Sequence, residues 1–476
     1  MKNLLRPQMA VGWLPWSAVA FDRARAEGKV MLLSLDTAWS RACRDMDAQC
    51  YADHAIAEEI NNRFVPIRVD ADRRPDIAER YELGGLPTTA FLNSDGEILG
   101  GGTFVPPDRL LDALARVGKM GSATSTPNSQ LLTSTPPQAL EDNHFGVVSL
   151  ALEVDTIAAM VFDTFDHQHA GFGGAPKFPL VAPVRLALEL SRESASPEMA
   201  GYVARTLDAM GWNALYDDEG GGFFRCALGG DWQEAQREKL LVTNAVLLDL
   251  YLEAGVTTGN QRWLGRAADV LEYVQSKLAS APGEGWRASE ESDGARFADA
   301  NAAMVSAALH ASRVFGDESI GQLALQSLET VLLATYRPGQ GVAHCVGGVR
   351  GLLTDHVAMI TAQLDAWDMT GNVVYRMMAE ELAHFAVRTM WDEKESGFFD
   401  RASMDEDGAF GRLAARLKPF VLNCEAAEAF DRLSRSTEEE GLSRYAVGAL
   451  DAVHPRALQH GPLAAQYVRA RRALSR

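Results

Sequence analysis

The first 118 residues alternate between short apolar runs and longer amphipathic stretches. Apolar runs of strand length occupy residues 30–35, 64–69, 88–92 and 98–99. Stretches with the 3.6-residue period of an amphipathic helix lie around and between them, near residues 17–27, 40–62, 73–83 and 107–117. Strands that alternate with helices in this order predict a small α/β sheet.

Strand patterns nearly disappear from the rest of the chain. Twelve amphipathic helical stretches follow, near residues 148–166, 181–194, 198–215, 237–255, 260–279, 299–315, 318–335, 353–370, 373–391, 414–433, 437–452 and 460–474. Every second loop between them places glycines beside one apolar or aromatic residue: Phe172, Phe223, Trp286, Val342 and Phe398, at intervals of 51, 63, 56 and 56 residues. This recurrence predicts an internal repeat of two helices.

The length of the repeat decides between two architectures. An open array of helix pairs is one, but TPR and HEAT repeats run about 34 to 47 residues, which is shorter than the period here. A closed ring of six hairpins is therefore favoured. Between the two parts, residues 121–137 are uncharged and rich in Ser, Thr and Pro, which indicates a linker. We expect an α/β domain of thioredoxin type at residues 1–118, a linker at 119–145 and an all-α (α/α)6 toroid at 146–476.

Composition narrows the classes of function. The chain has 476 residues and a formal net charge of −19, and such an acidic chain repels phosphate backbones, which argues against a nucleic-acid partner. No apolar run approaches the ~18 residues of a membrane-spanning helix, and the first seven residues lack the apolar core of a secretion signal. The five scattered cysteines form no disulfide framework. These features predict a soluble cytoplasmic protein with no membrane partner.

Polar residues recur where four alternate helices begin. The candidate binding residues among them are Asn244, Asp299, Asn301, Asn423 and Glu425. In a closed toroid these starts converge on the axis, where helix N-termini add partial positive charge. The resulting funnel of amides and carboxylates would suit a small polar, carbohydrate-like ligand. The alternative is that each residue is a helix cap, which stabilises a helix by about 1 kcal/mol.

The same helix starts hold the candidates for catalysis. His356 follows Asp355 and titrates near neutrality, which makes it the best acid–base candidate, with a structural histidine as the alternative. A pair of carboxylates for glycoside hydrolysis could come from Glu238, Asp299, Asp355 and Glu425. Four further histidines in loops show no metal-site spacing, so we expect neither a metal nor a cofactor. They are His167, His169, His344 and His460.

Several motifs fall in the order of a known family. They include Trp13 to Trp16, Phe64 to Asp70, Gly85 to Thr88, Gly101 to Phe104 and the nine-residue run Gly171 to Pro179, which contains Lys177. Together they resemble the spermatogenesis-associated thioredoxin-domain family. The resemblance implies a thioredoxin-like domain followed by a six-hairpin-glycosidase-like barrel, and it makes Lys177 a candidate binding residue. It covers the first domain well and the second one patchily.

The chain departs from the family at its redox motif. Family members carry Cys-x-x-Cys at the start of the first long helix, where this chain has Ser40 and Cys43. Dithiol exchange needs two thiols, so an internal disulfide cannot form at this motif. Cys50 lies seven residues further, or about 10 Å along a helix, which exceeds the reach of a disulfide. In the barrel, Gln236 and Thr243 replace the His and Asp of the family.

Two roles remain open for the first domain. Cys43 lies near a helix start between Arg41 and Arg44, which would lower its pKa for a monothiol reaction, although a buried structural thiol is the alternative. Pro87 matches the cis-proline of thioredoxins, beside which a protein partner could dock at the Ser40 corner. We expect the first domain to dock a partner and to lack dithiol chemistry. We expect the toroid to bind its ligand or to transform it, in the latter case as a sugar-type isomerase or hydrolase. A monothiol enzyme and a non-catalytic scaffold are the alternatives.

Overall fold

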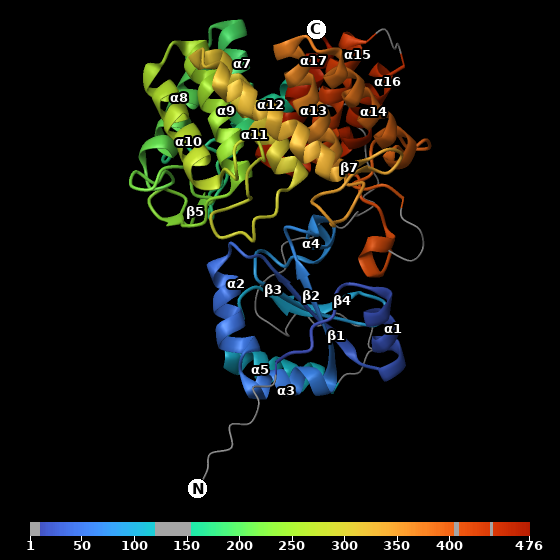
Figure 1. Ribbon diagram of the computed structural model, residues 1–476. Coiled ribbons are helices and arrows are strands. Elements are labelled where there is room, and N and C mark those ends of the chain that lie inside the picture. The colour runs from blue at the N-terminus through green and yellow to red at the C-terminus, as the bar shows by residue number, and fades with distance from the viewer. Residues whose placement is uncertain (1–9, 120–153, 404–408, 438–440) are drawn as a thin grey trace. The chain divides into compact units, whose positions relative to one another are not determined.

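The computed structural model describes residues 10–119, 154–403, 409–437 and 441–476. The chain forms two compact units (Figure 1). The first comprises Met1–Phe145 with Ser403–Arg416, and the second comprises Gly146–Ala402 with Leu417–Arg476. Residues 120–145 of the predicted linker lie outside the described residues.

The first unit is a four-stranded sheet with helices on both faces. Its elements are α1 (Ala18–Glu27), β1 (Val30–Asp36), α2 (Arg41–Met46), a π-helix (Asp47–Tyr51), α3 (His54–Arg63), β2 (Phe64–Asp70), α4 (Pro75–Tyr81), β3 (Thr88–Leu92), β4 (Ile98–Gly102) and α5 (Pro107–Val117). The strand order is β2-β1-β3-β4. Strand β1 pairs parallel with β2 and antiparallel with β3, which in turn pairs antiparallel with β4. This is the thioredoxin-like sheet that the sequence predicts.

Strand β1 shows why its sequence reads as a continuous apolar run. Val30 and Leu32 point into the core on the side of α3 and α5, whereas Met31, Leu33 and Leu35 point into the core on the side of α1 and α4. Because helices cover both faces, successive residues are all buried and the alternation of a half-exposed strand is absent.

The second unit is a closed ring of helical hairpins. Its inner helices are α7 (Val181–Ser194), α9 (Leu241–Thr258), α11 (Ala298–Phe315), α13 (Leu353–Thr370), α15 (Phe420–Ser436) and α17 (Ala464–Leu474). The outer helices are α6 (Val154–Phe162), α8 (Pro197–Trp212), α10 (Gln261–Tyr273), α12 (Glu318–Thr335), α14 (Val373–Met390) and α16 (Ser443–Val453). Each inner helix contacts the next, and α17 contacts α7. This contact closes the ring and confirms the (α/α)6 toroid.

Tight turns join inner helices to outer helices at one end of the ring. Helices α9, α11 and α13 each end at a glycine in the left-handed conformation: Gly259, Gly316 and Gly371, with φ of 73°, 68° and 67°. The next residue caps the following outer helix with its side chain: Asn260, Asp317 and Asn372. Glycine adopts this φ without strain and so ends the inner helix. The Asn or Asp side chain accepts hydrogen bonds from the free N–H groups at the start of the outer helix. A glycine followed by Asn or Asp is therefore enough to reverse the direction of the chain. No helix among the described residues is both long and apolar enough to cross a bilayer.

Candidate functional site

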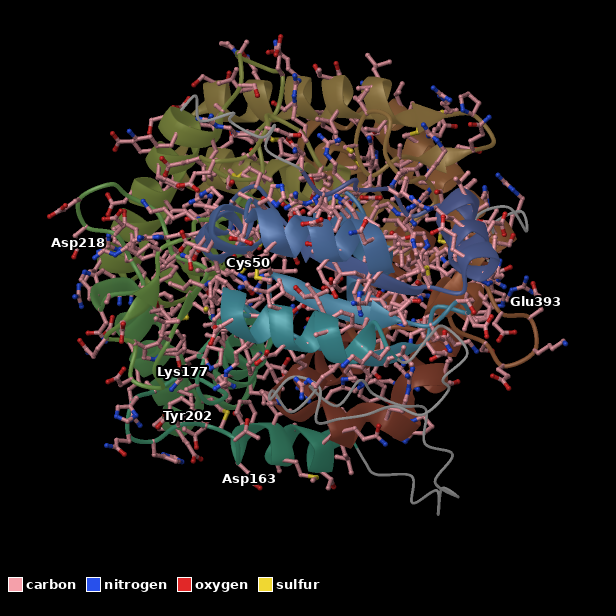
Figure 2. The ribbon with its side chains drawn as sticks, turned by 90° about the horizontal axis from the view of Figure 1, so that it is seen from below. Cys50, Asp163, Lys177, Tyr202, Asp218 and Glu393 are labelled. Atoms are coloured by element: carbon pink, nitrogen blue, oxygen red, sulfur yellow. The ribbon has the colours of Figure 1, made fainter. Side chains whose placement is uncertain are left out.

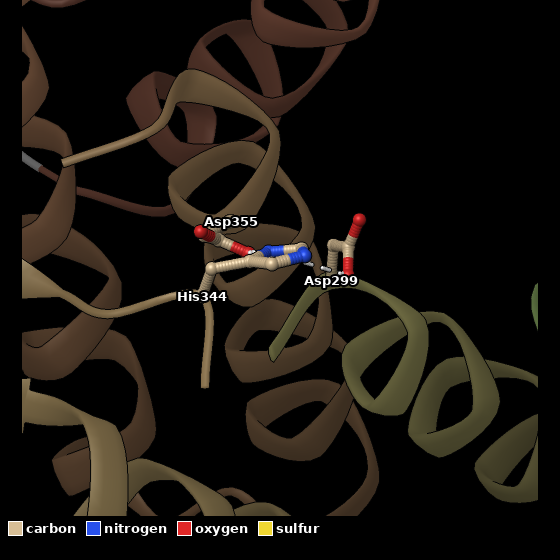
Figure 3. A group of neighbouring side chains, drawn as sticks. All are labelled: Asp299, His344 and Asp355. Carbon is tan, nitrogen blue, oxygen red and sulfur yellow. Dashed lines mark hydrogen bonds and ion pairs between the residues drawn. The ribbon is translucent and has the colours of Figure 1, made fainter. Parts of the chain in front are cut away.

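Two inner helices and one loop bring together Asp299, His344 and Asp355 (Figure 3). Asp299 lies in the first turn of α11 and Asp355 in the first turn of α13. His344 lies in the loop before α13, where its backbone carbonyl accepts a hydrogen bond from Ala298 N–H at 2.8 Å. Nδ1 of His344 is 2.8 Å from Oδ1 of Asp355 and 3.9 Å from Oδ1 of Asp299. The histidine thus lies between two carboxylates from neighbouring helices.

The two carboxylates differ in their surroundings. The side chain of Asp355 is 0% exposed, and that of Asp299 is 30% exposed. Burial raises the pKa of Asp355 to about 6, against the opposing effect of His344. Its Oδ2 has no hydrogen-bond partner within the described part of the chain. The ring of His344 also stacks on Phe297, with centroids 4.9 Å apart, so a hydrogen bond and a stacked ring together hold its orientation.

This arrangement suits proton transfer. A buried carboxylate that accepts from Nδ1–H fixes the tautomer and orientation of an imidazole, and stabilises its protonated form. The same three residues could also hold a metal ion, because their ligand atoms lie within 4.8 Å of one another. They form the one such group of His, Cys, Asp and Glu side chains among the described residues. The 2.8 Å pair is a hydrogen bond, and Nδ1 would have to give up its proton before it could bind a cation. The geometry therefore fits the acid–base role directly.

Three predicted binding residues have a structural role in the fold. The side chains of Asn244, Asn301 and Asn423 are buried and bonded to the preceding Gly-aromatic loops. In each case Oδ1 accepts from one loop N–H and Nδ2 donates to the carbonyl of the same loop residue: Phe223, Trp286 and Phe398. Nδ2 also donates to the carbonyl four residues earlier. All these polar atoms are satisfied inside the protein, so we assign the asparagines to loop attachment rather than to ligand binding.

His356 occupies the equivalent position on α13. Its Nδ1 is 2.7 Å from the carbonyl of Leu352, and its Nε2 accepts from Val342 N–H at 3.2 Å. The ring is fully buried, which lowers its pKa to about 4. Both ring nitrogens are therefore occupied inside the protein, which weighs against the expected acid–base role of His356. The histidine beside Asp355 in space is His344.

Lys177 is likewise enclosed. Its side chain is 0% exposed, and Nζ donates to Asp166 Oδ2 at 2.6 Å and to the carbonyl of Gly230 at 2.9 Å. Lys239 repeats the arrangement one hairpin later, with Asp217 at 2.7 Å and the carbonyl of Gly221 at 2.7 Å. The ammonium of Lys177 is bonded entirely inside the protein, so we assign this residue to loop attachment rather than to ligand binding.

Glu238 and Glu425 lie outside the Asp299–His344–Asp355 group. The backbone carbonyl of Glu238 accepts from Arg225 N–H at 2.8 Å. Glu425 is half-buried on α15, where burial and the neighbouring Glu428 raise its pKa to about 7. Asp299 and Asp355 are thus the two candidate carboxylates that the ring brings together.

The thioredoxin-like unit holds its thiols inside. Ser40 caps α2, accepting from Cys43 N–H at 3.3 Å. Cys43 is 3% exposed, and burial raises its pKa, in contrast to the expected lowering by Arg41 and Arg44. Cys50 lies in the π-helix, where burial raises its pKa to about 11. The Leu86–Pro87 peptide is cis, as the motif predicts.

His344 is the site residue that the sequence did not single out. Its spacing from the three other loop histidines matches no metal motif, so the sequence offers no reason to prefer it. The available signal is its position, two residues after Val342 in a Gly-rich loop that packs on the start of α13.

Comparisons with known proteins agree with both units. Residues 4–121 match the family Thioredox_DsbH, described as "Protein of unknown function, DUF255". The chain is 29% identical over 313 residues to human spermatogenesis-associated protein 20, across 60% of this chain and 39% of that protein. The chain therefore spans about two fifths of the length of the curated relatives it matches.

The helical unit is similar to solved structures of sugar-active enzymes. Cellobiose 2-epimerase from Bacillus thermoamylovorans has a TM-score of 0.52 and 13% identity, over 62% of this chain and 83% of that one. The GH76 alpha-mannanase from Bacteroides thetaiotaomicron has a TM-score of 0.53 and 11% identity, over 68% of this chain and 96% of that one. At such identities the likeness shows the fold alone.

Fold and comparisons together define a class: a thioredoxin-like domain joined to a six-hairpin-glycosidase-like toroid. Within that class, residues 4–121 match the DUF255 thioredoxin-like family, and the chain is homologous to spermatogenesis-associated protein 20.

Proposed function

We propose that the toroid binds a small polyhydroxylated ligand where α11 and α13 begin, and that the Asp299–His344–Asp355 trio exchanges a proton with it. The observation that carries this proposal is the placement of His344 between a fully buried and a partly exposed carboxylate. Buried ionisable groups with a specific charge partner are typical of functional sites.

The three residues take different parts. Asp355, which is buried, holds the Nδ1 proton of His344 and stabilises the charged imidazolium. His344 accepts or donates the transferred proton, since an imidazole changes charge near neutral pH. Asp299 retains exposure and offers a carboxylate acceptor to a ligand hydroxyl. The fold supports a sugar-type ligand, because it is shared with a cellobiose epimerase and a mannanase.

The thioredoxin-like domain then serves for docking of a protein partner and not for redox chemistry. Support for this part comes from Ser40, which replaces one thiol of the dithiol motif, and from the buried Cys43. The same burial weighs against the monothiol alternative, because only the thiolate is a nucleophile. A wholly non-catalytic scaffold is the remaining alternative, and the experiment below separates it.

A thermal-shift screen of the full chain tests the site. The compounds are aldoses, ketoses, disaccharides and sugar acids, and the proteins are the parent, Asp299→Asn and His344→Gln. We expect at least one compound to raise the melting temperature of the parent, and both variants to lose that rise. Asp218→Asn is the control: its side chain is 80% exposed and lies at the periphery of the helical unit (Figure 2). A rise of equal size in both site variants would place the ligand elsewhere, and no rise with any compound would favour the scaffold.

A further inference from the structure

A short segment from the C-terminal half of the chain is part of the thioredoxin-like unit. Residues 409–416, which we call the strap, belong to the first unit, although the chain on either side of Ser403–Arg416 belongs to the second. The strap contains a short 3-10 helix, Gly411–Ala414.

The strap contributes apolar side chains to the core of the unit. Leu413 is 0% exposed and packs in the cluster that contains Trp16, Phe21 and Tyr81, on the α1 and α4 face of the sheet. Phe410 stacks on Phe21 with ring centroids 5.3 Å apart. Burial of apolar side chains is the main favourable contribution to such contacts, so the strap adds to the core on this face.

Hydrogen bonds fix the strap backbone in one register. Arg80, which is 7% exposed, donates from Nε to the carbonyl of Arg412 at 3.1 Å and from Nη2 to the carbonyl of Ala415 at 2.8 Å. The hydroxyl of Tyr81 accepts from Arg412 N–H at 2.8 Å and donates to the carbonyl of Gly96 at 2.8 Å. A buried guanidinium is costly without acceptors, and the strap carbonyls provide two of them.

The strap also packs against the β3–β4 turn at two glycines. A Cβ atom on Gly96 would lie 2.5 Å from the Cα of Gly411, and the φ of Gly96 is +84°. Any side chain at Gly96 would therefore displace the strap. The exposed end of the contact carries a salt bridge, in which Arg412 Nη2 is 3.3 Å from Glu97 Oε2.

The segment that carries the strap is closed at its base. Asp400 N–H donates to the carbonyl of Leu417 at 2.7 Å, and Leu417 N–H donates to Oδ1 of Asp400 at 2.8 Å. Closing a loop before it binds lowers the entropy that binding must overcome. The two ends of the chain that flank Ser403–Arg416 are thus bonded to each other.

We propose that the surface formed by α1, α4 and the β3–β4 turn of the thioredoxin-like domain is a peptide-binding site, occupied by residues 409–416 of the same chain. The occupant is recognised through Leu413 in an apolar socket and through backbone carbonyls that face Arg80. The domain of residues 1–118 is therefore completed by a segment about 300 residues away, and the strap holds the two parts of the chain together when the linker is cut.

The test uses the full chain with a site for a specific protease inserted in residues 121–137. After cleavage, we expect the two fragments to co-elute from a size-exclusion column. Arg80→Ala should weaken their association at least tenfold, because two charge-assisted hydrogen bonds are lost. Leu413→Ser should weaken it about a hundredfold. The matched controls are Arg109→Ala and Leu228→Ser, at exposed positions, which should leave the affinity unchanged.

A peptide competition keeps the proposal testable if a variant folds poorly. A synthetic peptide of residues 409–417 should release the N-terminal fragment from the cleaved parent, and the same peptide with Leu413→Ser should not. The proposal is overturned if the cleaved parent fragments separate without a competitor. It is also overturned if neither Arg80→Ala nor Leu413→Ser changes the affinity while circular dichroism shows both variants to be folded, or if the two peptides act alike.

Discussion

The side chain of Asn301 forms a pair of hydrogen bonds with the backbone of Trp286. Its Oδ1 accepts from Trp286 N–H at 2.8 Å, and its Nδ2 donates to the carbonyl of Trp286 at 2.9 Å. The same pair recurs between Asn244 and Phe223 and between Asn423 and Phe398, so the starts of α9, α11 and α15 each hold the loop that precedes them. One structural solution is therefore repeated around the ring.

Replacement of Asn301 by alanine tests this role. The change leaves the buried N–H and carbonyl of Trp286 without their partners, at a cost of about 1–3 kcal/mol for each unsatisfied group. We expect Asn301→Ala to lower the free energy of unfolding by about 2–4 kcal/mol in urea denaturation. Gln322→Ala, an amide removed from an exposed position of α12, should change it by less than about 0.5 kcal/mol. An equally small effect of Asn301→Ala would contradict the loop attachment.

Lys177 offers a second test of the repeated loop structure. Burial would raise the pKa of Asp166, but the hydrogen bond and charge of the Lys177 ammonium hold it far below its usual range. Lys177→Met keeps most of the buried aliphatic chain but leaves Asp166 without this ammonium partner. We expect a loss of about 2–3 kcal/mol of stability, less than for a completely buried pair because Asp166 keeps 23% exposure. Lys394→Met, at an exposed loop position, is the control. Unchanged chemical denaturation of the Lys177 variant would show that the ion pair contributes nothing.

The architecture could be predicted from the sequence because the same patterns of residues recur along the chain. Alternating strands and helices indicated the first unit, and the recurring Gly-aromatic loops indicated the ring. The polar helix starts were harder to interpret, since an asparagine in a first helical turn is compatible with a ligand pocket, a cap or a loop contact. Only the structure shows that Asn244 and Asn301 bond to loop backbone 21 and 15 residues away.

The catalytic candidates show a related limit. Asp355 and His356 are adjacent in sequence, but consecutive residues of a helix do not face each other. Asp355 instead bonds to His344, 11 residues earlier, in a loop whose path depends on packing. The contact between the strap and α4 could not be predicted from the sequence either. Arg80 and Arg412 are 332 residues apart, and neither lies in a motif.

Thiol reactivity tests the reading of the first unit. All five cysteines are free and buried, and burial raises the pKa of Cys43. We expect the folded chain to react with fewer than one equivalent of a disulfide reagent within minutes at pH 8, and the chain in guanidinium to react with all five thiols. The chain should also fail to reduce insulin disulfides. A rapid thiol in the parent that disappears in Cys43→Ala would revive the monothiol enzyme.

Glu425 predicts an unusual dependence of stability on pH. Burial, with the charge of Glu428, raises its pKa from 4.5 to about 7 in the folded chain, although Arg185 and Arg469 oppose the shift. The folded state therefore binds more protons than the unfolded state between about pH 4.5 and 7. The contribution of the neutral carboxyl is fully present below pH 4.5 and is lost as the pH rises towards 7.

Glu425→Gln keeps a neutral side chain of similar shape at every pH. We expect the variant to match the parent near pH 5 and to exceed it by about 2 kcal/mol at pH 8, measured by urea denaturation. Glu272→Gln, on the exposed side of α10, should show no such divergence, and parallel stability curves for Glu425→Gln and the parent would mean that Glu425 is ionised at neutral pH in the folded chain.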